Sequence, residues 1–158
     1  MLKFTEAEVT FSEVPDEITL CINISNCPNH CPECHSKWLW EDIGKELTEE
    51  ELSKLITNNK GITCVAFLGG DNSPKGVNKL AEYVKQENLL TCWYSGKEEI
   101  SKEIELRNFD FIKLGPYKKE CGPLSSPHTN QKFFEVNRIS KIPDKVTLHD
   151  ITHKFQEK

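Results

Sequence analysis

Four short apolar runs, separated by polar or amphipathic segments, constrain the fold of this chain more than any other feature. The runs cover residues 18–24, 62–68, 89–94 and 109–114. Runs of this length are typical of strands, and the run at 62–68 is apolar at nearly every position, as expected for a strand that is covered on both faces. We therefore predict that each run forms a strand.

The segments between these runs carry signals for helices. Thr48 and Glu51 have the spacing of a capping box, ahead of a stripe of apolar residues. Ser73 followed by Pro74 marks the start of a second helix, because proline is favoured in the first helical turn. A shorter helix is predicted over residues 97–106.

Strands that alternate with helices at this spacing predict an α/β fold with a parallel sheet and right-handed crossovers. A closed barrel of this kind usually needs at least about 200 residues, whereas this chain has 158. We therefore expect a single domain over residues 1–158 that forms a partial (βα) barrel of mostly parallel strands, open on one side. Beyond residue 135 the pattern weakens: "FFEV" and "KVTLHDI" are candidates for further strands, and the chain is expected to fray from about residue 150.

Composition argues against two kinds of partner. A net charge of -5 offers no basic surface for nucleic acid. No stretch approaches the about 20 apolar residues that cross a membrane, and the first residues have neither the cationic flank nor the apolar stretch of a signal peptide. We therefore expect a cytoplasmic protein without a membrane partner. Its cysteines would then be reduced.

Cysteine is the residue type with the strongest functional signal, because the chain has seven. Cys21, Cys64 and Cys92 lie within apolar runs, and we expect them in the core, where a thiol behaves as a small hydrophobic side chain. Cys121 lies in a polar segment and is expected at the surface. The remaining three cysteines are clustered and call for a chemical explanation.

The clustered cysteines are Cys27, Cys31 and Cys34, in the stretch "CPNHCPEC" directly after the first strand. A structural zinc site would need a fourth ligand, such as His30 or His35, but zinc fingers usually use two separated ligand pairs and no second pair is present. A simple ferredoxin would need a fourth cysteine at a regular spacing. A 4Fe-4S cluster held by three thiolates would leave one iron open to a substrate.

Unusual loops follow all four predicted strands. In parallel sheets the functional residues gather at the carboxyl ends of the strands. The loops at these ends are the cysteine segment, Gly69-Gly70-Asp71, Ser95-Gly96 and Gly115-Pro116-Tyr117. We therefore expect the functional site at this end of the sheet.

The x3 and x2 spacing of the cysteines after a strand is also the signature of radical S-adenosylmethionine (radical SAM) enzymes. Within that superfamily the chain resembles the anaerobic ribonucleoside-triphosphate reductase activating proteins. The matching segments run from about Cys21 to Val136: "CINISNCPNHCPECHS", "EDIGKELTEEEL", "FLGGD", "YSG", "DFIKLGPY" and "GPLSSPHTNQKFFEV". The resemblance implies a radical SAM domain that reductively cleaves S-adenosylmethionine at a 4Fe-4S cluster and generates a glycyl radical on a reductase.

The resemblance also implies a set of iron ligands. Cys27, Cys31 and Cys34 would hold three irons, and the iron without a cysteine would bind the amino and carboxylate groups of S-adenosylmethionine. One position departs from the wider family, which often has an aromatic residue before the third cysteine, where this chain has Glu33.

Contacts to S-adenosylmethionine are implied for Gly69, Gly70, Asp71, Ser95 and Lys113. The first three stand where the family has Gly-Gly-Glu, so that the glycines would allow close backbone approach and the carboxylate would accept hydrogen bonds from the ammonium group. Ser95 would face the cofactor, and Lys113 would pair with its carboxylate. No catalytic residue beyond the cluster and the cofactor is implied.

Partners follow from the same resemblance. They are the glycyl-radical subunit of an anaerobic ribonucleoside-triphosphate reductase and a low-potential electron donor such as flavodoxin or ferredoxin. The segment 116–134 is long, irregular and polar, and such loops tend to be functional. We hypothesise that it frames the opening for the glycine loop of the reductase, with Thr129, Asn130 and Gln131 as contacts.

Two alternatives remain open at this point. Another small radical SAM enzyme, such as a pyruvate formate-lyase activase or a carboxy-deazaguanine synthase, would share the cysteine motif but not "GPY" followed by "TNQ". A non-catalytic zinc or iron–sulfur binding module would be colourless with zinc, or would hold a cluster that is indifferent to S-adenosylmethionine.

Overall fold

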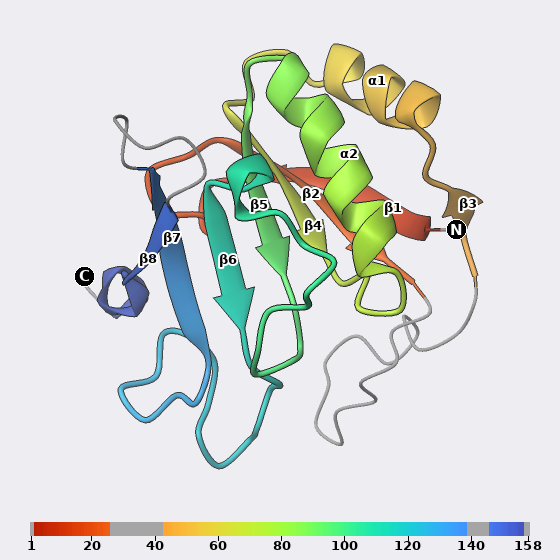
Figure 1. The fold of residues 1–158 in the computed structure, drawn as a ribbon. Coiled ribbons are helices and arrows are strands. Elements are labelled where there is room, and N and C mark those ends of the chain that lie inside the picture. Colours follow the sequence, from red (N-terminus) through yellow and green to blue (C-terminus); the bar gives the residue numbers. More distant parts are fainter. Residues whose placement is uncertain (1, 26–42, 139–145, 157–158) are drawn as a thin grey trace.

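A mixed sheet of eight strands forms the body of the described part of the protein (Figure 1). The computed structural model describes residues 2–25, 43–138 and 146–156. The strand order is β3-β1-β2-β4-β5-β6-β7-β8. The strands are β1 (Lys3–Thr10), β2 (Thr19–Ile24), β3 (Lys45–Glu46), β4 (Cys64–Leu68), β5 (Leu90–Tyr94), β6 (Phe111–Leu114), β7 (Lys132–Arg138) and β8 (Val146–Asp150).

The predicted partial (βα) barrel of mostly parallel strands is wrong. Parallel pairing is confined to the central strands β2, β4, β5 and β6, whereas the outer strands β1, β3, β7 and β8 pair antiparallel. The described residues contain two α-helices, α1 (Glu49–Asn58) and α2 (Pro74–Gln86), so the fold is mostly β. The reason lies in the connections, because a loop can join antiparallel neighbours, whereas parallel neighbours need a crossover.

The four predicted strands are confirmed as β2, β4, β5 and β6, with boundaries that shift by at most two residues. The two candidate strands "FFEV" and "KVTLHDI" correspond to β7 and β8. Strand β1 was not predicted from the sequence. Its pairing with β2 shifts register between Phe4 and Glu6, and this irregularity interrupts the alternation of buried and exposed residues by which a strand is recognised.

Both long helices begin where their capping signals predict. The Glu51 N–H donates to Thr48 Oγ1 over 3.1 Å at the start of α1. Pro74 opens α2, whose buried face consists of Val77, Leu80, Ala81 and Val84. These features depend on residues that are close in sequence, and the sequence patterns were sufficient to locate them.

The predicted helix over residues 97–106 is wrong. The chain forms turns there, followed by a short 3-10 helix, η2 (Leu106–Asn108). Side chains bind two backbone N–H groups of the segment 97–106 and keep them out of helical hydrogen bonds. The Glu103 N–H donates to Ser101 Oγ over 3.2 Å, and the Glu105 N–H donates to Asn78 Oδ1 of α2 over 2.8 Å. Such side-chain acceptors compete with the helical hydrogen bonds.

Two hydrophobic cores lie on opposite faces of the sheet. Helices α1 and α2 cover one face (Figure 1), where their apolar residues pack on β2, β4 and β5. The other core contains Cys21, Cys64 and Cys92, and the prediction that these thiols are buried is confirmed. None of the helices in the described ranges is long and apolar enough to cross a membrane.

No α-helix of the described residues covers the other face of the sheet, called the helix-free face below, and loops and the end of the chain close it. Val14, from the loop between β1 and β2, is fully buried there beside Leu124 of the long segment after β6. At the carboxyl terminus, where we expected fraying, residues 152–155 form the 3-10 helix η3 (Thr152–Phe155). The rings of Phe155 and Phe133 pack with their centroids 4.9 Å apart. Access to this face of the central strands is therefore restricted.

Candidate functional site

The predicted iron ligands Cys27, Cys31 and Cys34 lie outside the described residues, in the segment 26–42. His30, His35 and Glu33 belong to the same segment. Their predicted roles therefore stay predictions.

The described residues on either side of this segment lie next to each other. Ser25 is 1% exposed, and its hydroxyl hydrogen-bonds to the carbonyls of Ile43, over 2.5 Å, and Lys3, over 3.2 Å. Strand β2 ends at Ile24, whose carbonyl oxygen would lie 3.1 Å from a Cβ atom placed on Gly69. The cysteine segment therefore leaves and rejoins the described structure at the carboxyl end of β2, beside the glycines that follow β4.

Gly69 and Gly70 occupy backbone conformations that favour glycine, with φ angles of 109° and 98°. The Gly69 N–H donates to Tyr94 O over 3.0 Å, and Trp93 Nε1 donates to Gly69 O over 2.8 Å. A Cβ atom on Gly70 would lie 2.5 Å from a methyl carbon of Val77 in α2. The turn is thus tied to β5 and packed on α2, and it directs the next residue toward the loop after β5.

That next residue, Asp71, is joined to the end of β5 through both of its carboxylate oxygens. Ser95 Oγ donates to Asp71 Oδ1 over 2.6 Å, and the Gly96 N–H donates to Asp71 Oδ2 over 2.8 Å. Ser95 is 1% exposed, whereas Asp71 is partly exposed. Hydrogen bonds to a carboxylate are stronger than neutral ones, so the loops after β4 and β5 are held together.

Lys113 is buried at the carboxyl end of β6, with 8% of its surface exposed. Its Nζ donates to Gly115 O over 2.8 Å and to Ser95 O over 3.3 Å, and it lies 5.7 Å from the centre of the Tyr94 ring. The lysine thus joins the ends of β5 and β6. Its predicted pairing with a cofactor carboxylate stays a prediction.

The predicted partner contacts Thr129, Asn130 and Gln131 lie against the loop that follows β6. Thr129 Oγ1 donates to Gly122 O over 3.3 Å, and Asn130 Nδ2 donates to Pro116 O over 2.9 Å. Gln131 is 7% exposed, whereas Thr129 and Asn130 are partly exposed. These residues stabilise the segment that was predicted to face the partner, and their contact with a partner stays a prediction.

The sequence did not single out two backbone groups of this site. They are the Gly96 N–H, which binds Asp71, and the Gly115 carbonyl, which binds Lys113. A glycine within two residues of a strand end was the available signal in both cases, in "YSG" and "KLGPY". Sequence patterns identify such glycines, but they do not show which side chain reaches their backbone.

Nearby ionisable groups show how dry the interior is beside this site. Burial raises the pKa of the Tyr94 hydroxyl well above its ordinary value, and that hydroxyl donates to the Glu13 carbonyl.

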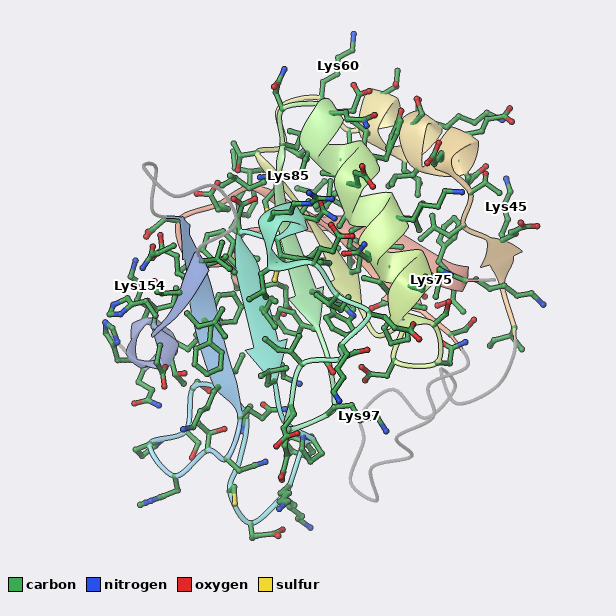
Figure 2. The ribbon with its side chains drawn as sticks, in the orientation of Figure 1. Lys45, Lys60, Lys75, Lys85, Lys97 and Lys154 are labelled. Atoms are coloured by element: carbon green, nitrogen blue, oxygen red, sulfur yellow. The ribbon has the colours of Figure 1, made fainter. Side chains whose placement is uncertain are left out.

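Figure 2 shows Lys75 and Lys97 at the end of the sheet where β4, β5 and β6 terminate, and Lys60 and Lys85 near the opposite end. In the described ranges, no group of three or more His, Cys, Asp or Glu residues is placed to hold a metal ion.

Asp71 and Lys113 place one acidic and one basic side chain at the carboxyl ends of β4 and β6. Asp71 presents a partly exposed carboxylate that can accept hydrogen bonds from an ammonium group, and a carboxylate has about four acceptor positions. Lys113 supplies a positive charge at the same strand ends. The predicted pairing of Asp71 and Lys113 with the amino acid portion of S-adenosylmethionine stays a prediction.

Comparison with known protein families gives one match. The family model described as "4Fe-4S single cluster domain" matches residues 18–127. The matched range is more than half of the chain, and it includes the cysteine segment, the loops after β4 and β5, and the loop after β6 as far as residue 127. No curated protein matches the chain significantly.

Proposed function

This chain belongs to the 4Fe-4S single cluster domain family, and from this premise we propose that it is a radical SAM activase of an anaerobic ribonucleotide reductase. The family match supports a 4Fe-4S cluster as the cofactor. In this proposal Cys27, Cys31 and Cys34 are the ligands, because iron–sulfur clusters are held by thiolates and these three are clustered in the matched range. The fourth iron is left for S-adenosylmethionine.

One observation carries the proposal: the loops after β4 and β5 meet at Asp71, the end of β6 contacts the β5 loop, and Gly69 lies beside the end of β2, where the cysteine segment begins. Asp71 is linked to the β5 loop through Ser95 and Gly96, and Ser95 in turn is linked to β6 through Lys113. In this proposal the Asp71 carboxylate accepts hydrogen bonds from the ammonium group of S-adenosylmethionine, and the Gly69-Gly70 turn lets the cofactor approach the backbone.

The protein's own residues would bind and orient the reactants. When bound, the cluster would supply the electron that breaks a C–S bond of S-adenosylmethionine and gives a 5′-deoxyadenosyl radical. A hydrogen atom would then move from a glycine Cα of the reductase to the 5′ carbon, leaving 5′-deoxyadenosine, methionine and a glycyl radical. This transfer requires orientation and exclusion of water, but no protein base.

We propose that the reductase approaches the end of the sheet rather than its helix-free face. Val14 and Leu124 are buried on that face and cover part of the central strands. The opening that remains there beside Tyr94 is lined mainly by loop residues, such as Phe11, and by Phe155 near the end of the chain. The segment 116–131 borders the strand ends, and its partly exposed Thr129 and Asn130 are the proposed contacts, with Gln131 supporting them from inside. A low-potential donor such as flavodoxin or ferredoxin would reduce the cluster.

The first experiment measures S-adenosylmethionine cleavage. The protein is reconstituted with iron and sulfide without oxygen, reduced with dithionite, and incubated with S-adenosylmethionine, and 5′-deoxyadenosine is quantified. We expect product with the wild-type protein and none with Cys31→Ala. Cys121→Ala is the matched control, because this cysteine is partly exposed and lies outside the cluster motif. A protein fully loaded with cluster that forms no 5′-deoxyadenosine would refute the radical SAM proposal.

The second experiment identifies the substrate. The reduced protein and S-adenosylmethionine are mixed with the glycyl-radical subunit of an anaerobic ribonucleotide reductase, and electron paramagnetic resonance is used to detect a glycyl radical. A variant of the reductase in which the radical glycine is alanine serves as the control. Cleavage without a glycyl radical would favour another small radical SAM enzyme, whereas a cluster indifferent to S-adenosylmethionine would favour a non-catalytic iron–sulfur module.

A further inference from the structure

The carbonyl of Gly115, directly after β6, receives hydrogen bonds from two buried side chains. Lys113 Nζ donates to it over 2.8 Å and Gln131 Nε2 over 3.4 Å. Lys113 is 8% exposed and Gln131 is 7% exposed, so both bonds are shielded from water. A hydrogen bond in such surroundings is electrostatically stronger than the same bond in water.

The backbone around this carbonyl is packed against the strand that follows. Gly115 has a φ of 107°, and a Cβ atom on it would lie 3.2 Å from Gln131 Cα and 3.3 Å from Asn130 O. Asn130 Nδ2 donates to Pro116 O over 2.9 Å. The Asn130-Gln131 pair therefore fixes both peptide carbonyls of the Gly115-Pro116 turn, and the absence of a side chain at Gly115 allows this close contact.

A chain of hydrogen bonds connects this turn to Asp71. The ammonium group of Lys113 that binds Gly115 also binds Ser95 O over 3.3 Å. The hydroxyl of Ser95 donates to Asp71, and so does the backbone N–H of Gly96. A second connection runs through the backbone, because the Gly115 N–H donates to Lys97 O over 2.7 Å. A displacement of the Gly115 turn would thus move the donors that hold the Asp71 carboxylate.

We propose that Lys113 and Gln131 are positioning residues, which converge on the Gly115 carbonyl and thereby hold Asp71 in the orientation that binds S-adenosylmethionine. This inference rests on the proposed function, since it concerns the same cofactor. The inference gives Gln131 a role in cofactor binding that acts through the Gly115 carbonyl and not through a hydrogen bond to Asp71. It also explains physically why "GPY" and "TNQ" occur together in this chain: the second motif holds the carbonyls of the first.

The test compares S-adenosylmethionine binding by the reconstituted wild-type protein and by Gln131→Leu, in the absence of any reductase. Binding is followed through the change that S-adenosylmethionine causes in the electron paramagnetic resonance spectrum of the reduced cluster. Leucine is similar in size to glutamine but cannot donate to the Gly115 carbonyl. Gln156→Leu is the matched control, because Gln156 Nε2 also donates to a backbone carbonyl of the segment after β6, that of Ser126, over 3.0 Å.

We expect Gln131→Leu to weaken S-adenosylmethionine binding about fivefold, the effect of one neutral hydrogen bond, with unchanged iron content. Lys113→Met should weaken it further, and the double variant should lose less than the product of the two single effects, because both side chains act on one carbonyl. Gln156→Leu should bind as the wild type does. If Lys113→Met does not fold, the affinity of Gln131→Leu for S-adenosylmethionine tests the proposal without it.

Two results would overturn the inference, and they differ in what else they overturn. If Gln131→Leu binds S-adenosylmethionine as tightly as the wild type, the positioning role is wrong while the proposed function stands; weaker binding to the reductase would then identify Gln131 as a partner contact. If the wild-type protein with a full cluster does not respond to S-adenosylmethionine at all, the proposed function fails together with the inference.

Discussion

Replacing Asp71 by asparagine tests whether the end of β4 is held to the end of β5 through a carboxylate. The substitution keeps the shape of the side chain and removes its charge. Asp71 accepts from Ser95 Oγ over 2.6 Å and from the Gly96 N–H over 2.8 Å. Asparagine can accept from Gly96 through its oxygen, but it then presents an amide N–H₂ group to the Ser95 hydroxyl.

The expected loss of stability follows from the strength of these two bonds. A hydrogen bond to a charged group contributes about 1.5–3 kcal/mol and a neutral one about 1 kcal/mol. Since Asp71 is partly exposed, the lower values apply, and we expect Asp71→Asn to lower the free energy of unfolding by about 2 kcal/mol. For a chain of this size that loss corresponds to a decrease of about 6 °C in melting temperature.

The assay is thermal unfolding of the cluster-loaded protein under anaerobic conditions, with Glu99→Gln as control. Glu99 is an exposed carboxylate on the loop after β5, so its replacement should change the melting temperature by less than about 1 °C. Asp71→Glu should also destabilise the protein, although glutamate is the usual residue of the resembled family, because the added methylene displaces the carboxylate from both donors. A melting temperature of Asp71→Asn equal to that of the control would refute this account.

Three further predictions concern the described structure. Burial raises the pKa of Cys21 to about 11, so that about one Cys21 thiol in a thousand is ionised at pH 8. Mass spectrometry should show that iodoacetamide labels the partly exposed Cys121 and leaves Cys21 unmodified until the pH approaches 11. Rapid labelling of Cys21 at pH 8 would contradict its burial. Gly70→Ala should lower the free energy of unfolding, measured in urea, by about 3 kcal/mol, since it combines a left-handed backbone with a clash against α2. The control Gly61→Ala, with a similar φ but no atom within 4 Å of the added Cβ, should lower it by about 1 kcal/mol. Equal losses for the two variants would refute the clash. Trp93→Phe removes the indole donor from a carbonyl after β4 and should cost about 2 kcal/mol in the same experiment, and an unchanged midpoint would show that the carbonyl has another partner.

The site was only partly accessible from the sequence. "GGD", "YSG" and "KLGPY" identified loops after three strands, and the structure brings these loops together at Asp71, Ser95 and Lys113. The burial of Lys113 and Gln131 was not foreseen, because both are polar residues in polar or mixed stretches. Their surroundings are supplied by strands and loops that are distant in sequence.

The fold, like the site, was only partly accessible from the sequence. Thr48 and Pro74 mark helix starts through contacts within a few residues, and the apolar runs mark strands through their own composition, so the sequence alone was sufficient for these elements. The direction of the outer strands was not accessible, since it depends on how the chain returns to the sheet. The helix predicted over 97–106 failed because the acceptor Asn78, in α2, captures a backbone donor of that segment.

The sequence by itself therefore determined the spacing of the cysteines, the central strands and the caps of α1 and α2, all of which depend on neighbouring residues. The tertiary structure decided that the sheet is mixed, that loops close its helix-free face, and that the Gly115 carbonyl is shared by Lys113 and Gln131. The physical reason is that hydrogen bonds between distant segments depend on the relative placement of whole strands, and no local pattern of residue types specifies that placement.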